Sequence, residues 1–545
     1  MGNFTYSMGL VISPKDPDDI LVKTLNSIIN QTQKPDEIII LKNGQLNIFK
    51  IKLLEEFSKV VSVDTLLLES KTALDFAQAL NLVIENTKCD YLIRQDPDDI
   101  CVRNRVEIIK KEIDKNEYDL FHSSTLEFNR KSRTVLQKKI PKSFNEIRES
   151  LIYLNPILHS TVVISTKLLK NHGGYETALL AEDYLLWLKI FQSKVKVGYF
   201  ENPLVVFDST NKFKKRSSKI LFRTELKIFK YKISIKFNSF LSFASLVIRL
   251  GYIFMPNLIK KLIDERNIFP HDTKFVDEIE ELNSIPLRKE DIIKKISIDV
   301  IIPNFNREKE LNEAIRSVTK QTISNQIQII VIDDQSNFDV TIEPILKSTS
   351  KIHELKNTLR SGGPAVPRNI GLDFSKADLI AFLDSDDLWS PEHLENALKY
   401  TPFGISYAQN INNVSDTNFT LRKLIKNNLI ITSSVVISKD LKEKIGFFPY
   451  SSSHSIYEDY AYWLRSTLFQ DFYLNGTNLI EYSENSRDSY RKSYNRDFIC
   501  LFYTFQNLCS YASDSNKKID FFAKVSIFYR IIKSFVISLF YFFRK

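Results

Sequence analysis

The stretch LIAFLDSDD, from Leu379 to Asp387, places an apolar run directly before three carboxylates. A run of about five apolar residues has the length of a buried strand in an α/β sheet. Three aspartates within four residues repel one another and are costly to bury without partners. We therefore expect the run to be a strand and the aspartates to lie beyond its carboxyl end, where open α/β sheets bind their ligands.

A second stretch, YLIRQDPDD from Tyr91 to Asp99, has the same arrangement. Three other segments also occur twice, in the same order along the chain: SIINQT at 27–32 and SVTKQT at 317–322, STVVIS at 160–165 and SSVVIS at 433–438, EDYLLWL at 182–188 and EDYAYWL at 458–464. The copies lie between 273 residues apart (433 against 160) and 290 residues apart (317 against 27). A period of this size is that of a whole domain, so a duplicated domain is predicted.

The duplication and the distribution of charge and proline predict five segments. They are a first unit over 1–210, a basic amphipathic helical segment over 211–265, a linker over 266–295, a second unit over 296–520 and a basic amphipathic tail over 521–545. The linker is expected because this region is charged and contains Pro270 and Pro286.

Each unit is predicted to alternate strands with helices. Strands are expected at 91–93, 298–303, 328–332 and 379–383, and a helix at 308–320. Short apolar strands separated by helices are typical of a mostly parallel α/β sheet.

The composition fits a globular protein with a large core, since 43% of the 545 residues are hydrophobic and 26% are charged. Neither a structural zinc site nor a disulfide framework is expected, because no CxxC pair occurs among the cysteines, Cys89, Cys101, Cys500 and Cys509. The first ten residues lack a charged start followed by an apolar run. We therefore expect no secretory signal and a cytoplasmic location.

Two segments are both basic and apolar. Between Lys212 and Lys236 there are ten Lys or Arg and one acid, Glu225, interleaved with aromatic and aliphatic residues. Such a stripe is typical of binding to nucleic acid or to an anionic membrane, or of a solvated helix face. Because residues 521–545 repeat the pattern, we favour peripheral contact with an anionic membrane and expect no nucleic-acid partner.

The C-terminal segment is too short to span a bilayer. Its longest uncharged stretch, Ser534–Phe543, is well below the roughly 20 residues that a spanning helix needs. We expect it to lie in the membrane interface, and the alternative is a core helix of the second unit.

The aspartates of the two matching stretches are candidates for a metal site. Carboxylate oxygens at a strand end are ligands that Mg²⁺ or Mn²⁺ prefers, and such a cation holds a diphosphate. An acidic turn or a helix cap is the alternative for a single copy. The recurrence of the motif at 96–99 and 384–387 favours the metal.

An acidic pair opens each copy of the EDY segment, Glu182 with Asp183 and Glu458 with Asp459. Acidic residues also favour the first turn of any helix, which is the alternative interpretation. Opposite a metal-bound diphosphate, such a carboxylate is able to deprotonate an attacking hydroxyl group.

Two further features of the second unit indicate a nucleotide. Asp334, at a predicted strand end, is able to accept hydrogen bonds from a base such as uracil, although a turn is the commoner use of aspartate there. The loop SGGPA at 361–365 precedes Arg368, whose guanidinium suits a phosphate.

Together these motifs resemble the inverting family-2 glycosyltransferases of GT-A fold. In the second unit the set is PNFN at 303–306, SVTKQT at 317–322, DDQS at 333–336, GGPAVPRN at 362–369, DSDD at 384–387 and ED at 458–459. The resemblance implies an α/β fold with two GT-A domains in tandem and accessory amphipathic helices. It also implies roles: Asp459 as catalytic base, Asp386 as metal ligand, Asp334 at the uracil, Arg368 near the donor phosphates, and Pro303, Phe305, Asn306 and Asp384 at the nucleotide sugar.

The first unit resembles a subgroup of this family found in amylovoran and exopolysaccharide gene clusters. The matching segments include KPDEI at 34–38, ALN at 79–81, RQDPDDI at 94–100, NPILH at 155–159, GGY at 173–175 and EDY at 182–184. The resemblance implies Asp183 as base, Asp98 as metal ligand, and Asn43 and Asp96 at the nucleotide sugar. In the two units together it places five residues near the acceptor or the active site, which are His159, Glu182, Trp187, Glu458 and Trp463. For His159 a purely structural role is the alternative.

Two positions of the first unit depart from the subgroup. Asn43 stands where an aspartate is usual between Lys42 and Gly44, and Asp208 stands where an arginine usually follows the aromatic residue. Both changes bear on donor choice. They leave open the alternative that the first unit is an inactive acceptor-binding or scaffolding module and only the second is catalytic.

The resemblance implies a bifunctional hexosyl- or N-acetylhexosaminyltransferase of bacterial capsule, O-antigen or exopolysaccharide synthesis. UDP-sugars are the expected donors and Mn²⁺ or Mg²⁺ the cofactor. The expected acceptor is a saccharide or lipid-linked saccharide at the inner face of the cytoplasmic membrane. A nucleotidyltransferase is the competing enzyme class, but no glycine-rich run with a following lysine opens the chain near the first strand.

Overall fold

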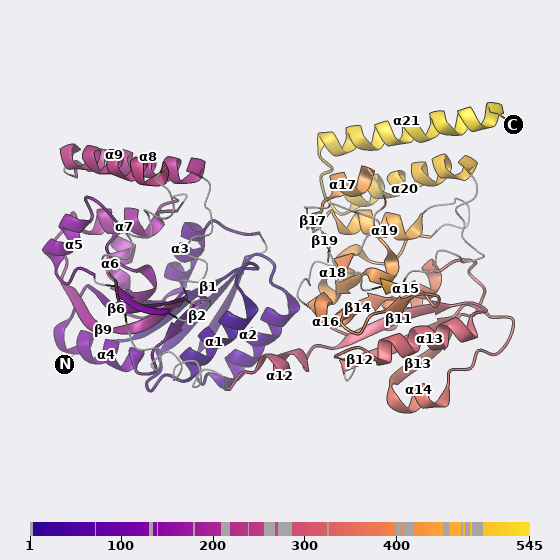
Figure 1. Cartoon of the computed structure of the whole chain (residues 1–545), viewed down its shortest axis with the longest axis horizontal. Coiled ribbons are helices and arrows are strands. Elements are labelled where there is room, and N and C mark those ends of the chain that lie inside the picture. The colour runs from indigo at the N-terminus through magenta and orange to yellow at the C-terminus, as the bar shows by residue number, and fades with distance from the viewer. Residues whose placement is uncertain are drawn as a thin grey trace. The chain divides into compact units, whose positions relative to one another are not determined.

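The chain folds into two compact units in a computed structural model (Figure 1). One unit comprises Met1–Leu46 with Leu53–Lys289, and the other comprises Glu290–Lys545 with Asn47–Lys52. The structure describes residues 4–70, 72–129, 134–138, 140–177, 180–208, 218–237, 239–254, 268–270, 286–323, 326–398, 405–406, 418–426, 428, 430–450, 457–469, 472–474, 480–481 and 494–544.

The first unit is built on a sheet whose strand order is β10-β7-β6-β8-β4-β1-β2-β3, with β9 paired to β5 and β6. The strands are β1 (Tyr6–Ile12), β2 (Glu37–Asn43), β3 (Thr65–Ser70), β4 (Tyr91–Arg94), β5 (Asp99–Cys101), β6 (Leu120–Asn129), β7 (Thr134–Lys138), β8 (Val163–Ser165), β9 (Val197–Asp208) and β10 (Ile268–Pro270). The helices are α1 (Asp18–Ile29), α2 (Ile48–Val60), α3 (Phe76–Asn86), α4 (Arg105–Asn116), α5 (Phe144–Ser150), α6 (Thr166–Asn171), α7 (Glu182–Ile190), α8 (Ser218–Ser234) and α9 (Ser239–Phe254).

The main sheet of the second unit has the order β13-β12-β11-β14-β18, and two small sheets pair β15 with β20 and β16 with β19 and β17. The strands are β11 (Ile298–Asn304), β12 (Ile327–Asp333), β13 (Lys351–Lys356), β14 (Leu379–Phe382), β15 (Leu388–Trp389), β16 (Ile405–Ser406), β17 (Asn418–Phe419), β18 (Val436–Ser438), β19 (Phe472–Leu474) and β20 (Ile480–Glu481). The helices are α12 (Lys289–Ile293), α13 (Glu308–Thr319), α14 (Pro344–Thr349), α15 (Ala365–Phe374), α16 (His393–Leu398), α17 (Leu421–Lys426), α18 (Lys439–Ile445), α19 (Glu458–Ser466), α20 (Tyr494–Asp514) and α21 (Phe521–Arg544).

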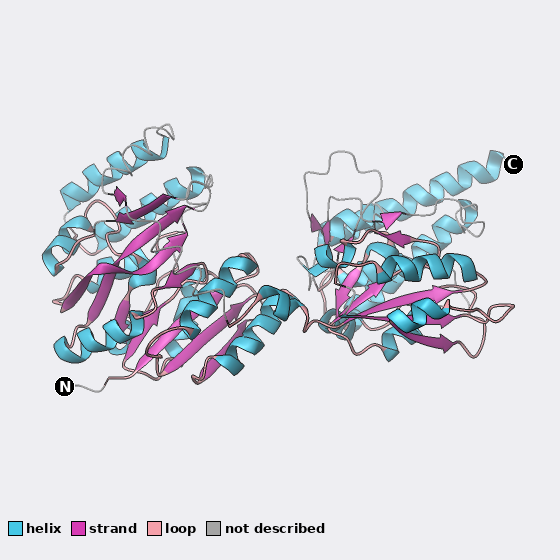
Figure 2. Ribbon diagram, turned by 60° about the horizontal axis from the view of Figure 1, so that its bottom comes forward, coloured by secondary structure: helices cyan, strands magenta, loops and turns pink. Residues whose placement is uncertain are grey.

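The two units share one strand topology. In each, three crossovers join parallel neighbours, β4-β1-β2-β3 and β14-β11-β12-β13, and an antiparallel strand, β8 or β18, closes the order. The central strands β1, β4, β11 and β14 are buried on both faces, whereas the edge strands β3 and β13 are partly exposed. Helices cover the sheets on both sides (Figure 2). The predicted domain duplication and parallel α/β sheets are therefore confirmed, and β4, β11, β12, β14 and α13 lie where we expected them.

Accessory helices pack on the helix that follows the acidic pair in each unit. In the first unit α8 and α9 lie over α7, and in the second α20 and α21 lie over α17 and α19 (Figure 1). Ile228 and Phe237 join the first core cluster, and Ala523 and Ile527 of α21 join that of the second. One face of α21 is thus part of the core, which was our alternative for the C-terminal segment.

A basic side chain, the buried Lys232 or the half-buried Arg530, anchors the accessory helices at matching places. The Lys232 Nζ donates to the Tyr184 hydroxyl at 3.0 Å and to the Ile152 carbonyl at 2.7 Å. The Arg530 guanidinium donates to the Tyr460 hydroxyl at 2.6 Å and to the Ile425 carbonyl. The Tyr184 and Tyr460 hydroxyls in turn donate to the carbonyls of Leu151 and Leu424, each one residue before the isoleucine that the cation contacts. The two accessory segments therefore hold equivalent positions although their sequences differ.

The predicted linker over 266–295 is only partly a linker. Its residues 268–270 form β10, which pairs antiparallel with β7, and Leu287 exchanges two hydrogen bonds with the Asn26 side chain. Residues 211–217 and 255–265 of the predicted helical segment lie outside the described residues. Across the residues that are described, we find no helix of sufficient length and apolarity to cross a membrane.

Candidate active sites

The acidic motif of each unit follows a central strand and alternates in exposure. Asp96 and Asp98 after β4 are half-buried, whereas Asp99 is buried. Asp384 and Asp386 after β14 are half-buried, whereas Asp387 is buried and accepts a hydrogen bond from the Ser433 hydroxyl. Two of the three carboxylates in each motif are therefore accessible, on alternate residues of an extended turn.

A buried arginine pairs with the first aspartate of each motif. In the first unit Arg94 lies 2.5 Å from Asp96, and in the second Arg368 lies 2.6 Å from Asp384. The two arginines come from different elements, since Arg94 ends strand β4 and Arg368 lies in helix α15. Arg94 is a site residue that we did not predict, because nothing in the motif marks it as a partner of Asp96.

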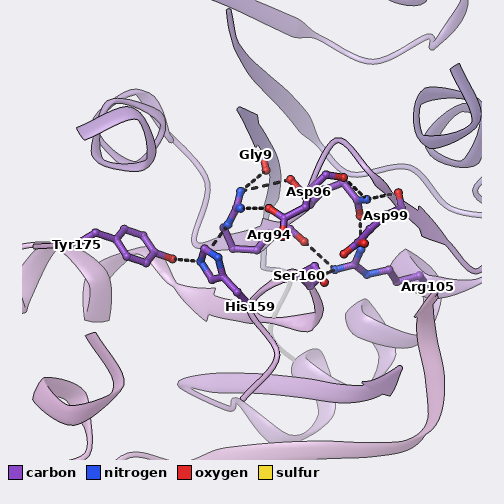
Figure 3. A network of polar contacts seen from close by, with 9 residues as sticks. Gly9, Arg94, Asp96, Asp99, Arg105, His159, Ser160 and Tyr175 are labelled. Carbon is purple, nitrogen blue, oxygen red and sulfur yellow. Dashed lines mark hydrogen bonds and ion pairs between the residues drawn. The ribbon is translucent and has the colours of Figure 1, made fainter. Parts of the chain in front are cut away.

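Arg94 links Asp96 to a histidine and a tyrosine in the first unit (Figure 3). Its guanidinium donates to the Gly9 carbonyl at 3.0 Å and to His159 Nε2 at 3.3 Å. The Tyr175 hydroxyl lies 2.7 Å from the same His159 nitrogen. An arginine N–H only donates, so His159 Nε2 is an unprotonated acceptor, and burial holds the pKa of His159 well below its usual range.

Charge is concentrated around the second motif as well. Arg307 Nη1 lies 2.6 Å from Asp386 Oδ2. Burial lowers the pKa of Arg368, but the charges of Asp384, Glu458 and Asp459 outweigh it and raise that pKa above its ordinary value. The acidic pair that opens α19 and the motif that follows β14 therefore act on one guanidinium, although they are more than 70 residues apart in the sequence.

The two candidate bases are held in the same way. The Tyr184 backbone N–H donates to Asp183 Oδ1 at 2.7 Å, and that of Tyr460 donates to Asp459 Oδ1 at 2.6 Å. The second oxygen accepts from a polar side chain, Asn155 at 2.6 Å in the first unit and Thr432 at 3.5 Å in the second. One carboxylate oxygen in each site is thus fixed by the backbone and the other by a neighbouring loop.

Burial raises the pKa of all four carboxyl groups in the acidic pairs. The pKa of Asp183 is raised to about 6 and that of Glu182 to about 7, and the negative charge of Asp96 adds to both shifts. The pKa of Glu458 is raised to about 7, and that of Asp459 is raised as well. A carboxylate with a pKa near neutrality is a stronger base than a solvated one, as general base catalysis requires.

The predicted nucleotide residues of the second unit gather at the ends of β11 and β12. Pro303 is buried in β11, and the ring of Phe305 stacks against the Arg360 guanidinium at 4.1 Å. Asn306 has a left-handed backbone (φ 55°), and its side chain accepts from the Asn337 backbone N–H at 2.7 Å. Asp334 accepts hydrogen bonds from Asn357 and from the Ser361 hydroxyl and backbone N–H.

Asn43 in the first unit is engaged differently from Asp334. Its amide donates to the Leu74 carbonyl at 3.1 Å and accepts from the Leu74 N–H at 2.8 Å. An aspartate would lack the donor for the first of these bonds. The departure from the Lys-Asp-Gly pattern therefore has a structural reason, a two-way bridge from the end of β2 to the segment before α3.

Both predicted acceptor-site tryptophans are core residues. Trp187 and Trp463 are 0% exposed. Among the described residues, neither indole nitrogen has a hydrogen-bond partner. Trp463 packs edge-on against Phe382, and Trp187 against His159. With no exposed surface these side chains offer no contact to an acceptor, and their place in the vicinity of the active site stays a prediction. The sequence does indicate this burial, because each tryptophan lies in a run of apolar and aromatic residues, Tyr184–Leu188 in α7 and Tyr460–Leu464 in α19.

The residues present fit a metal that arrives together with a diphosphate. Within the described residues no group of three or more His, Cys, Asp or Glu is arranged to hold a metal ion. Each motif instead presents two half-buried carboxylates, Asp96 with Asp98 and Asp384 with Asp386. Mg²⁺ is commonly bound by one or two carboxylates while substrate phosphates complete its coordination. Metal binding at Asp386 would require Arg307 to leave that carboxylate.

Known proteins match both units. The family model described as Glycosyl transferase family 2 matches residues 16–168 and 299–459. UDP-Glc:alpha-D-GlcNAc-diphosphoundecaprenol beta-1,3-glucosyltransferase WfgD of Escherichia coli is 32% identical over 31% of this chain and 68% of its own length. Amylovoran biosynthesis glycosyltransferase AmsE of Erwinia amylovora is 25% identical over 43% of this chain and 88% of its own length.

Solved structures with similarity to the chain include Staphylococcus aureus TarS 1–349 in complex with UDP-GlcNAc. It covers 44% of this chain and 72% of its own, with 18% identity and a TM-score of 0.34. The chain spans 63%, 33% and 52% of the length of three further curated glycosyltransferases that it matches.

The duplicated parallel sheets with an acidic motif after a central strand, and the matches to both copies, define a sugar-transferring enzyme of the α/β class. The chain belongs to glycosyl transferase family 2, with two segments of that family in tandem. The expected α/β fold class with two family-2 units in tandem, and the expected glycosyltransferase class, are therefore confirmed.

Proposed function

We propose that each unit is a separate inverting glycosyltransferase site, with Asp183 and Asp459 as the catalytic bases. One observation carries this proposal: both units place an acidic pair with raised pKa values beside the arginine-paired acidic motif of a central strand. The bases lie at equivalent helix starts and are held by equivalent hydrogen bonds. Two sites built alike are expected to catalyse the same class of reaction.

In the proposed reaction the acceptor hydroxyl loses its proton to the free oxygen electron pair of Asp183 or Asp459. The hydroxyl oxygen then bonds to the anomeric carbon as the bond from that carbon to the diphosphate breaks. This single displacement inverts the anomeric centre and needs no covalent sugar–enzyme intermediate. A divalent cation supplies neutralisation of the charge that develops on the leaving diphosphate.

Asp98 and Asp386 would hold Mn²⁺ or Mg²⁺, with Asp96 and Asp384 beside them at the donor. Arg94 lies 2.5 Å from Asp96, and Arg368 lies 2.6 Å from Asp384. The residues proposed for the nucleotide in the second unit are Pro303, Phe305, Asn306 and Asp334. UDP is the proposed nucleotide because WfgD, by its name, uses a UDP-sugar.

The proposed acceptor is a saccharide or a lipid-linked saccharide of surface-polysaccharide synthesis. WfgD, by its name, acts on a diphosphoundecaprenol-linked sugar, and AmsE belongs to amylovoran biosynthesis. Glu182 and Glu458 stand next to the bases on the same helix starts and are candidates for contact with the acceptor. Trp187 and Trp463 pack beneath this region in the core, and the half-buried His159 lies against Trp187.

The accessory helices would bring the enzyme to the membrane that carries such an acceptor. On α21 the side opposite the core exposes a row of large apolar side chains, Phe521, Phe522, Val525, Phe528, Tyr529 and Ile532. On α9 Phe240 is 81% exposed and Ile248 is 66% exposed. Basic residues flank these rows, with Lys219, Arg223 and Lys230 exposed on α8 and Lys524 and Lys533 on α21. An apolar row flanked by lysine and arginine suits the interface of an anionic membrane, and a peripheral cytoplasmic location would follow.

The test is UDP release from a panel of UDP-sugars with Mn²⁺, comparing the wild type with Asp98→Ala and Asp386→Ala. If each variant loses a different donor, both units are working sites. If only Asp386→Ala loses activity, the first unit is an acceptor-binding or scaffolding module, which is the alternative function. Loss of neither activity would refute the assignment of the acidic motifs.

A further inference from the structure

The two units pair a buried arginine with the first aspartate of the acidic motif, but the arginine comes from a different element in each. Arg94 stands two residues before Asp96, and the residue two before Asp384 is Phe382. Arg368 directly precedes Asn369 in α15, and the residue directly before the matching Asn81 in α3 is Leu80. At each place where one unit has the arginine, the other has a buried apolar residue, because Leu80 and Phe382 are both buried.

The match between α3 and α15 is established by contacts as well as by sequence. The Asn81 side chain exchanges two hydrogen bonds with the Tyr175 backbone, at 2.8 Å each. The Asn369 side chain exchanges the same two bonds with the Phe448 backbone, at 2.9 and 2.7 Å. The preceding residues, Leu80 and Arg368, therefore occupy equivalent positions in the two sites.

A second exchange of the same kind occurs beside the first. Gly9 of β1 faces Val83 of α3, and a Cβ on Gly9 would approach the Val83 methyl group to 2.7 Å. In the second unit the bulk is on the other element: a Cβ on Gly371 of α15 would approach the Ile301 methyl group of β11 to 2.6 Å. In one unit the larger side chain comes from the helix and the glycine from the strand, and in the other unit the reverse holds. The helix–sheet interface therefore keeps its packing in both units.

The exchanged arginine meets different neighbours in the two units. Arg94 contacts His159 and, through it, Tyr175. Arg368 lies over the ring of Phe448, and Thr432 stands at the place of His159 and donates to the base Asp459. What stays constant between the two sites is therefore the pairing of a guanidinium with the first aspartate, and not the surroundings of that guanidinium.

From these relationships we infer that Arg94 is the positioning residue of the first donor site, with the function that Arg368 has in the second. This inference rests on the proposed function of the acidic motifs. Without Arg94, Asp96 would add an uncompensated negative charge where a diphosphate is to bind, and its carboxylate would lose its anchor. A unit that had lost its donor site would have no need for a replacement guanidinium at this aspartate, so the exchange also favours a working first unit.

The experiment moves the guanidinium within the first unit. All variants carry Asp386→Ala, which silences the second site, and UDP with Mn²⁺ is the probe in titration calorimetry. Arg94→Phe is expected to weaken UDP binding at least tenfold. The double variant Leu80→Arg/Arg94→Phe, which copies the arrangement of the second unit, is expected to restore binding to within about threefold of the parent. With the UDP-sugar that the parent hydrolyses or transfers, the KM should rise in Arg94→Phe and return toward the parent value in the double variant. The kcat should change less than the KM.

Thermal unfolding separates positioning from a purely structural role. A structural role predicts that Arg94→Phe melts earlier while the folded fraction binds UDP as the parent does, and this result would overturn the inference. So would a double variant that is folded but binds no better than Arg94→Phe. The reciprocal double variant, Arg368→Leu/Phe382→Arg in a chain with Asp98→Ala, provides the same comparison for the second site.

The failure of the proposed function has its own signature. If the Asp386→Ala parent binds no UDP but the wild type does, the first unit is no donor site; the inference then falls and the proposed function of the second unit stands. If neither chain binds UDP, the proposed function fails together with the inference.

Discussion

Lys232 of the accessory helix α8 donates a hydrogen bond at 3.0 Å to the hydroxyl of Tyr184, the residue that follows the proposed base Asp183. Arg530 of α21 makes the equivalent bond at 2.6 Å to Tyr460, which follows Asp459. The helix that begins with each acidic pair is therefore tied to an accessory helix through its third residue, Tyr184 or Tyr460. A membrane contact of the accessory helices would act on the catalytic helix through this bond.

Replacement of Lys232 by methionine is expected to destabilise the first unit. The substitution keeps most of the side-chain volume but leaves the buried Tyr184 hydroxyl and the half-buried Ile152 carbonyl without this donor, at a cost of about 1–3 kcal/mol. The melting temperature of the first unit should fall, and so should its turnover, because α7 loses an anchor. Lys230→Met is the control, since Lys230 is exposed on the same helix. Equal effects of the two substitutions would contradict the role of the buried amine.

Replacement of Asp459 by asparagine is expected to abolish one sugar transfer and spare the other. The amide keeps the shape of the side chain but does not take up the acceptor proton, so the rate at that site should fall about 10²- to 10⁴-fold. Product analysis with wild type, Asp459→Asn and Asp183→Asn would separate the two transfers. Asp440→Asn, at an exposed position of α18, serves as the control. Survival of both transfers in the two base variants would show that the bases are misassigned.

The activity of the first site is expected to fall below about pH 6. A base works only when ionised, and burial raises the pKa of Asp183 to about 6, so protonation begins well above the usual range of aspartate. The negative charge of Asp96 adds to this rise of the Asp183 pKa, and the Asn155 hydrogen bond opposes it by favouring the ionised form. Asn155→Ala should therefore move the acid limb of the pH–rate profile to higher pH, whereas Asn86→Ala on α3 should leave it in place. An acid limb near pH 4 in the wild type would argue against Asp183 as the base.

Replacement of Asn43 by aspartate is expected to lower stability rather than to improve donor binding. The new carboxylate would face the Leu74 carbonyl without a donor between them, at a cost of about 1–3 kcal/mol. The second unit gives the reverse comparison, because Asp334 accepts three hydrogen bonds, from Asn357 and Ser361. In Asp334→Asn the new amide NH₂ group would face these donors and would lose part of this bonding. Chemical denaturation and UDP titration would measure both. Tighter UDP binding in the Asn43→Asp chain would contradict this prediction.

Charge on the exposed row of α21 is expected to weaken binding to membranes. Phe528 and Ile532 face away from the core, and burial of each would contribute about 1.5–3 kcal/mol, so Phe528→Glu and Ile532→Glu should each lower the affinity about tenfold or more. Co-sedimentation with vesicles that contain phosphatidylglycerol measures the effect. Leu359→Glu, at a position that is 78% exposed elsewhere in the second unit, is the control. Unchanged co-sedimentation of all three variants would refute the membrane contact.

Much of the fold was predictable because its signals are local. The run from Ile298 and the run from Leu379 are short, apolar and followed by polar residues, and they form β11 and β14. The predicted helix over 308–320 is α13, which ends at Thr319. The sequence of each segment decides these elements, since the apolar period and the breakers lie within a few residues of one another.

The sites were only partly predictable. The acidic motifs and the acidic pairs are visible in the sequence because carboxylates in clusters are rare in strands and cores. The partners of these carboxylates are not visible. Arg94 and Arg368 serve equivalent aspartates from different elements, and Asn155 and Thr432 serve equivalent bases with different chemistry. An alignment of the two copies pairs Arg94 with a phenylalanine and so hides the equivalence.

The sequence by itself determined the duplication, the parallel α/β class and the positions of the two acidic motifs, because repeats, apolar runs and carboxylate clusters are properties of contiguous residues. Only the tertiary structure decided which guanidinium neutralises Asp96, that Trp187 and Trp463 belong to the core, and that Lys232 and Arg530 occupy matching places. Each of these depends on side chains from segments far apart in the chain. Ion pairs and packing contacts depend on proximity in space. Either of two elements that share an interface is therefore able to supply the charged or the larger side chain, and the sequence of neither element shows which one does.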